Sequence, residues 1–269
     1  MTAARTSDAW VEAIGLIGPG LDDWPHAAAV LRGERDYVPA RCALPMPPAL
    51  PPAERRRAGA AVRVALAVAT EAVTAANRSA AMLPTVFAAS GGDSDNCHSI
   101  CEVLASSERF ISPTRFHNSV HNAPAGYWSI AARAMTASTS LAAYDASFAA
   151  GLLEAVMQVR ATDAPCLLIA YDTAYPEPLF VKRPIPDAFA VALVLAPDRT
   201  ERALAHLTVN FSNDAADRCE IDALESLRAS NPAARALPVL AALARDRSSS
   251  VVVEYLGPPQ LRVQVELPS

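Results

Sequence analysis

Short apolar runs alternate along this chain with stretches of helical periodicity, and this alternation limits the folds open to it. Strands are expected where apolar and β-branched residues follow one another, and helices where apolar residues recur every three or four positions. The expected strands are Trp10–Ile17, Pro84–Ala89, Thr136–Ala143, Pro165–Tyr171, Ala188–Leu195, Leu204–Phe211, Ser249–Tyr255 and Leu261–Leu267. The expected helices are Asp23–Leu31, Glu54–Ala76, Ser94–Leu104, Ala146–Val159, Ile221–Ala229 and Ala234–Ala244. The alternation predicts an α/β or mixed α+β domain built in layers.

The composition supports one packed domain and excludes several classes of protein. Hydrophobic residues make up 52% and charged residues 19% of the 269 positions, which is enough for a sizeable core. The net charge is -5 and the one basic block is Arg55–Arg57, so no nucleic-acid partner is expected. No apolar run approaches the ~20 residues of a membrane span, and Met1–Asp8 lacks a signal-peptide core. A cytoplasmic protein is therefore expected.

The cysteines, together with two histidines, suggest one candidate metal site. The chain contains five, at Cys42, Cys97, Cys101, Cys166 and Cys219. An odd number favours free thiols over a disulfide framework. Cys97 and Cys101 precede His117 and His121 in an order that imitates a zinc site of two cysteines and two histidines. The fifteen residues between the two pairs exceed the zinc-finger norm, so core thiols and hydrogen-bonded histidines are expected instead.

Gly15, Gly18 and Gly20 follow the first expected strand and outline a dinucleotide-binding loop. Their spacing differs from the G-x-G-x-x-G pattern, and Pro19 removes a backbone N–H that such a loop would offer. A suitably placed acidic ribose partner is also missing. A simple turn from strand to helix explains these glycines.

Ser147, Asp172 and His206 occur in the chain order of the α/β-hydrolase triad, which makes a small serine hydrolase or thioesterase an alternative function. The strained turn that carries such a serine requires small residues two positions before and after it, and Asp145 occupies the first of these positions. The competing expectation is that Ser147 packs in the first turn of a helix.

Three segments resemble the β-ketoacyl synthase family. Pro113–Ile130, PTRFHNSVHNAPAGYWSI, resembles its P-T-x-F, S-x-x-N and A-G stretch; Ala137–Ala143 resembles the strand before the nucleophile, and Ala146–Ala155 the helix after it. Weaker similarity, through Leu168–Asp172, Arg183-Pro184 and Phe189–Leu195, extends the resemblance over Trp10–Ala196. It implies a thiolase-like layered α/β fold, with helices around a mixed five-stranded sheet and a truncated second half. It also implies a single domain over 10–269, with the family core at 10–196 and a divergent part at 197–269.

Other residues stand where the family holds its catalytic groups. The resemblance places Tyr144, followed by Asp145, where ketosynthases hold a cysteine at the start of a helix whose dipole favours the thiolate. Tyrosine has a pKa of ~10, and its phenolate is a poor acyl carrier. The His-Gly-Thr and Gly-His motifs of the family are missing, and His206 is the one histidine after Ala196. No condensing activity by this chain alone, no cofactor and no metal are therefore expected.

The resemblance implies a chain-length-factor-type subunit, of the kind found with ketosynthases of aryl-polyene and xanthomonadin-type pigment pathways. Its partners would be a catalytic β-ketoacyl synthase, in a heterodimer, and an acyl carrier protein that docks through that synthase. The strand Thr136–Ala143 would pair across the dimer. The residues near the partner's acyl tunnel would be Phe116, His117, Val120, His121, Asn122, Thr139 and Leu141. A purely structural homodimer is a further alternative.

Overall fold

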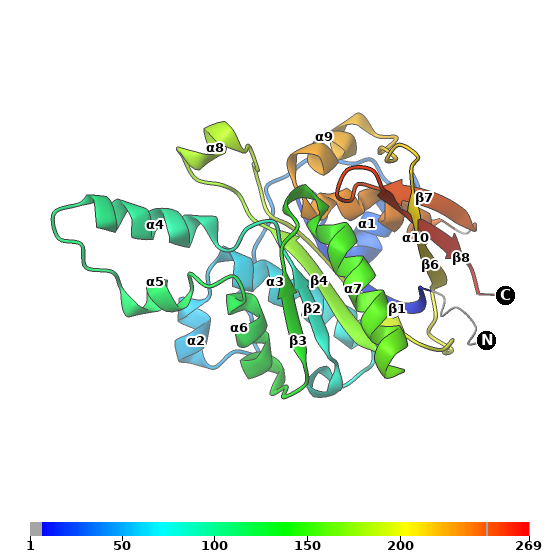
Figure 1. The fold of residues 1–269 in the computed structure, drawn as a ribbon, viewed down its shortest axis with the longest axis horizontal. Helices are drawn as coiled ribbons and strands as arrows, with labels where there is room; N and C mark the ends of the chain where they lie inside the picture. The colour runs from blue at the N-terminus through cyan, green and yellow to red at the C-terminus, as the bar shows by residue number, and fades with distance from the viewer. Residues whose placement is uncertain (1–6, 246, 269) are drawn as a thin grey trace.

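A twisted sheet with helices on both faces dominates the computed structural model, which describes residues 7–245 and 247–268 (Figure 1). The strands are β1 Asp8–Ile17, β2 Thr85–Ala88, β3 Ser138–Leu141, β4 Cys166–Asp172, β5 Phe189–Ala196, β6 Ala205–Ser212, β7 Ser249–Val253 and β8 Gln260–Glu266. The helices are α1 Trp24–Leu31, α2 Pro52–Arg57, α3 Ala60–Ala76, α4 Ser94–Ala105, α5 Pro113–His117, α6 Ala123–Ala132, α7 Ser147–Thr162, α8 Leu179–Lys182, α9 Asp222–Ser230 and α10 Leu237–Ala244. Short 3-10 turns lie at η1 Ala80–Met82, η2 Tyr144–Ala146 and η3 Ala233–Ala236.

The sheet has eight strands within the described ranges, in the order β3-β2-β4-β5-β1-β6-β8-β7. Strand β2 runs parallel to β3 and β4, and the other neighbours are antiparallel. The expectation of five strands was wrong. The cause is that β1 is buried and both of its edges need backbone partners; β5 pairs with one edge and β6 with the other. The C-terminal strands β6, β8 and β7 thereby extend the mixed sheet beyond β1.

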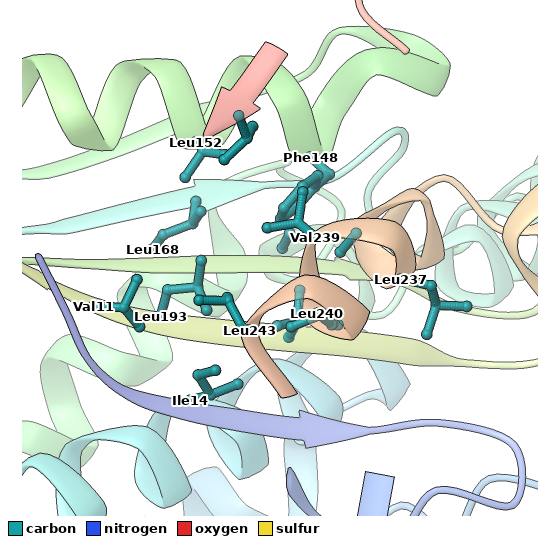
Figure 2. Packing of buried hydrophobic residues seen from close by; sticks show 14 of the residues in the cluster. Val11, Ile14, Phe148, Leu152, Leu168, Leu193, Leu237, Val239, Leu240 and Leu243 are labelled. Carbon is teal, nitrogen blue, oxygen red and sulfur yellow. The ribbon is translucent and has the colours of Figure 1, made fainter. Parts of the chain in front are cut away.

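Side chains alternate between two apolar layers, one on each face of the sheet. On one face, Leu168 of β4 and Leu193 of β5 belong to a cluster that includes α7 and α10. Figure 2 shows Phe148 and Leu152 of α7 lying on this side with Leu240. The alternate residues of β4 and β5 form the second cluster with α3 and α6. Full burial on both faces explains why β4 and β5 have continuous apolar sequences.

The two outer edges of the sheet differ. Strand β3 is the edge at one end and has no strand on its outer side among the described residues. At the other end, the backbone N–H of Asp217 donates to the Val252 carbonyl (2.8 Å), and the Asp217 carboxylate accepts from the Val252 N–H (2.7 Å). A loop therefore covers the edge of β7, whereas the edge of β3 is open.

Two expected elements are shorter than the sequence suggested. The helix expected from Glu54 to Ala76 is divided into α2 and α3, with Ala58 in an extended conformation between them. The division follows from a distant contact, because the Arg57 carbonyl accepts from the Asn118 side chain (2.8 Å) instead of continuing the helix. Strand β3 covers only Ser138–Leu141 of the expected 136–143.

Gly18 and Gly20 lie in the turn that was expected after the first strand, whereas Gly15 lies inside β1. A methyl group at Gly15 would collide with the Val68 carbonyl oxygen, so this glycine allows β1 to lie close to α3. At Gly18 it would meet the Phe189 ring, and Gly20 has a φ of +67° that favours glycine. In the described part of the chain, no helix combines the length and apolarity that crossing a bilayer requires.

Candidate functional site

The turn from β3 into α7 lies where the parallel strands β2, β3 and β4 end together. Tyr144 in this turn has a φ of +54°, in the left-handed region that non-glycine residues rarely adopt. Ser147 holds the turn, because its Oγ accepts from the Ala143 N–H (3.0 Å) and donates to the Tyr144 carbonyl (2.7 Å). The turn projects the Tyr144 side chain outward, and Tyr144 is 65% exposed.

Two arginines from distant segments surround this turn. The Asp145 carboxylate accepts from the Arg183 Nη2 (2.7 Å) and from the Arg235 Nη2 (3.0 Å). The Arg183 guanidinium also lies 3.6 Å from the centroid of the Tyr144 ring, in a cation–π contact. Sequence reasoning missed both arginines, because they follow Asp145 by 38 and 90 positions and no local pattern links them.

A buried carboxylate lies at the same end of the sheet. Asp172, the last residue of β4, accepts from the Ser90 hydroxyl (2.5 Å) and the Ser90 N–H (3.0 Å) through Oδ1. Its Oδ2 is buried without a hydrogen-bond partner among the described residues. Burial raises the pKa of Asp172 to about 7, although the Ser90 hydrogen bonds and the charge of Arg183 oppose the increase. The sequence did not indicate this role of Ser90.

The residues expected near a partner's tunnel fall into two groups. His121 and Leu141 meet at the end of β2, where the Ala89 carbonyl lies 3.3 Å from the His121 Nε2 and the Ala89 N–H donates to the Leu141 carbonyl (3.2 Å). Thr139 lies on β3 and accepts from Gln158 of α7 (2.9 Å). The others are exposed around α5 and the start of α6: Phe116, His117, Val120 and Asn122.

The hydrolase alternative is wrong, because the structure places His206 far from Ser147 and Asp172. The Ser147 hydroxyl is buried and engaged in the turn described above. His206 is opposite Trp10 at the start of β1 and contacts Asp8 (2.8 Å), whereas Asp172 is opposite Phe189 near the other end of the sheet. Seven residue steps along β1, from Trp10 to Ile17, separate these ends, which is roughly 20 Å of extended strand.

The cysteines lie away from the turn at Tyr144. Cys97 and Cys101 are exposed on α4, and Cys166 is buried at the start of β4, at the opposite end of that strand from Asp172. Burial raises the pKa of Cys166 to about 12. Within residues 7–245 and 247–268, no three His, Cys, Asp or Glu side chains are grouped as metal ligands, so Cys97, Cys101, His117 and His121 do not form the zinc site considered above.

Comparison with known proteins explains this architecture. A profile of the β-ketoacyl synthase N-terminal domain matches residues 29–255, most of the chain. The chain belongs to this family. No curated protein sequence matches it significantly. The predicted resemblance to β-ketoacyl synthases is thus confirmed over more of the chain than the three quoted segments.

Solved structures with the β-ketoacyl synthase fold are similar over 98% of this chain and 100% of their own. One is a chain from the complex of the ketosynthase ApeO and its chain length factor ApeC from Xenorhabdus doucetiae, with 22% identity and a TM-score of 0.71. The ishigamide ketosynthase/chain length factor has 15% identity and a TM-score of 0.71. A chain from AntDE:AntF, a type II PKS acyl-carrier protein in complex with its ketosynthase, has 10% identity and a TM-score of 0.75. These similarities confirm the predicted thiolase-like fold.

Proposed function

We propose that this chain is a chain-length-factor-like subunit, which has no condensing activity of its own and shapes the acyl tunnel of a catalytic ketosynthase partner. The observation that carries the proposal is the turn between β3 and α7. Tyr144 occupies its strained position, Asp145 is held by two arginines, and the described cysteines lie elsewhere. A phenol in place of a thiol offers no suitable acyl carrier. Two of the similar structures, by their own descriptions, contain a ketosynthase and a chain length factor.

The open edge of β3 is the proposed contact with the partner. The helices α6 and α7 carry partly exposed apolar side chains, with Ile130 of α6 45% and Met157 of α7 44% exposed. Met135, in the loop before β3, is 98% exposed. An open strand edge, together with exposed apolar groups, is suited to strand addition by a second chain.

A second part of the proposed contact is the arm formed by α4 and α5, which projects from the body of the molecule (Figure 1). Its apolar side chains are largely unpacked: Leu104 is 47%, Phe110 86% and Phe116 67% exposed. Together with Val120, Phe116 is positioned on a projecting segment, where it could extend into a neighbouring subunit and limit the space for an acyl chain.

The proposal predicts activity only in the pair. The purified chain is expected to release no CO₂ from malonyl carrier protein and to form no extended acyl product, because it lacks a nucleophile. Co-purification with a catalytic ketosynthase partner is expected to give products of defined length, measured by mass spectrometry. Robust condensation by the isolated chain would contradict the proposal, as would a synthase whose products are the same with and without this chain.

Ser140→Pro tests the interface directly. The carbonyls of Ala137 and Leu141 accept from β2, so the alternate residues Ser138 and Ser140 direct their backbone groups to the open edge. Proline at 140 removes an outward N–H while leaving these bonds to β2 intact. Partner affinity, measured by biolayer interferometry, is expected to fall roughly tenfold to hundredfold. Ser140→Ala retains the N–H and serves as the matched control; equal affinities of the two variants would exclude edge pairing.

The finer parts of the proposal rest on the resemblance. We assign the pair to polyene or fatty-acid-type biosynthesis, of the aryl-polyene and xanthomonadin pigment kind, in the cytoplasm, with the acyl carrier protein docking on the partner. We also propose one domain over 10–269, which the continuation of the sheet through β6, β8 and β7 supports.

A further inference from the structure

The crevice beside Tyr144 has features that the proposed function does not use. It is a cavity of about 210 Å³ at the elbow between β3 and α7. Tyr144 and Asp145 line one side, Lys182 and Arg183 at the end of α8 line the second, and Ala229 and Ser230 at the end of α9 close it. Three segments distant in sequence thus enclose a small space at the carboxyl ends of the parallel strands, where ligands commonly bind in α/β proteins.

Positive charge exceeds negative charge around this cavity. Asp145 is shared between Arg183 and Arg235, and Arg235 also contacts Glu254. Lys182 adds an exposed ammonium group at the rim. Burial lowers the pKa of Arg235, and repulsion by neighbouring arginines acts in the same direction against the attraction of Asp145. Among the residues that line the cavity, Lys182 and Arg183 outnumber Asp145 by one formal charge.

Two arginine N–H groups also have no hydrogen-bond acceptor. The Nε atoms of Arg183 and Arg235 are buried and unpaired among the described residues. A buried donor without an acceptor costs on the order of 1–3 kcal/mol. Because Arg183 lines the cavity, an anion placed there would lie beside its guanidinium charge.

We propose that this cavity binds a small oxyanion of single negative charge, a carboxylate or a phosphodiester, between Lys182 and Arg183. Arginine and lysine are the side chains that bind such oxyanions through charge-assisted hydrogen bonds. The Tyr144 side chain lines the same opening. Ile185 and Ala229 provide apolar wall for a short carbon chain attached to the anion. The site belongs to this chain alone and needs no partner subunit.

The sequence offers a direct probe, because lysine occurs once, at Lys182. Acetylation of the full chain with an amine-selective reagent, followed by peptide mass spectrometry, gives the reaction rate at this residue. Propionate and dimethyl phosphate are the two probes, and sodium chloride at equal ionic strength is the reference, because salt alone screens exposed charges. At ten times its Kd, a bound probe is expected to slow Lys182 acetylation roughly tenfold.

Variants test whether the protection of Lys182 from acetylation arises from binding in the cavity. Arg183→Gln is expected to lose the protection, whereas Arg41→Gln, at an exposed arginine of the proline-rich loop, is expected to keep it. Ala229→Leu retains every charge but fills the cavity from an exposed helix position, and should also lose the protection. If circular dichroism shows that Arg183→Gln fails to fold, Ala229→Leu is the variant that tests the cavity.

Each outcome decides the proposal. Protection by propionate alone assigns a carboxylate ligand, protection by dimethyl phosphate alone assigns a phosphodiester, and protection by both supports the shared oxyanion chemistry. If neither probe protects Lys182 better than chloride, the proposal is overturned. It is also overturned if the probes protect Lys182 in Ala229→Leu as well as in the unmodified chain. Because the isolated chain is used, these results are independent of whether a ketosynthase partner binds.

Discussion

Glu12→Ala is expected to destabilise the protein by about 3 kcal/mol, because it removes one partner of a buried ion pair. Glu12 lies in the middle of β1 and its side chain is 1% exposed. Its carboxylate accepts from the Arg78 Nη2 (2.7 Å), from the Arg78 Nε and from the Thr200 hydroxyl (2.9 Å). The Arg78 side chain is 30% exposed, so it can turn toward water when Glu12 is lost. The expected loss of folding free energy is therefore at the lower end of the range for broken buried ion pairs. Urea denaturation followed by circular dichroism measures the change.

Arg57→Gln is the matched control for Glu12→Ala. Arg57 also pairs with a glutamate, Glu54 at 3.2 Å, but its side chain is 52% exposed. A change below about 1 kcal/mol is expected, because solvent screens an exposed pair. Arg78→Met should cost at least as much as Glu12→Ala, since it leaves a fully buried carboxylate without a cation. Equal midpoints for Glu12→Ala and Arg57→Gln would mean that the buried pair contributes nothing to stability.

Asp172→Asn is expected to stabilise the protein above pH 7, by on the order of 3 kcal/mol. The folded-state pKa of Asp172 is raised to about 7, whereas an unfolded aspartate titrates near 3.9. Between these values the native state binds more protons than the unfolded state, so stability falls as pH rises from about 4 to about 7 and is constant above. Asparagine keeps an oxygen for the Ser90 hydrogen bonds and removes the buried charge.

Urea denaturation at pH 5 and at pH 8 tests this prediction. The unmodified chain should be less stable at pH 8 than the variant, and the difference should shrink toward pH 5. Asp95→Asn, at an exposed position in the first turn of α4, is the control and should shift neither curve. A variant that is destabilised equally at both pH values would show that Asp172 is ionised in the folded protein and stabilised by its partners.

Local signals in the sequence were sufficient for most of the elements. The expected helices over Asp23–Leu31 and Ser94–Leu104 are present as α1 and α4, and Asp23 and Asp93 cap them, each accepting an N–H three residues on. The continuous apolar runs of β4 and β5 predicted buried strands, and Gly257-Pro258-Pro259 separates the strands of the expected C-terminal hairpin. These features depend on residues within one turn or one strand of each other, which a sequence displays directly.

The features that escaped prediction depend on contacts between distant residues. The break before α3 follows from Asn118, which is 61 positions from Arg57. The sheet extends beyond β1 because β6 pairs with it, and no local pattern in β1 specifies that neighbour. The sequence did not indicate that Arg183 and Arg235 hold Asp145, because both are distant from it along the chain. The turn at Tyr144 was located only through the resemblance, since a left-handed tyrosine has no sequence signal.

The unequal edges of the sheet limit what this protein can assemble into. Growth of an assembly by repeated strand pairing requires two accessible sheet edges on every copy, because each added copy must offer a free edge to the next. Here the edge of β7 is occupied by Asp217, and among the described strands the open edge is that of β3. Association through backbone pairing should therefore stop at two chains, so that the protein pairs with one partner without nucleating a fibre.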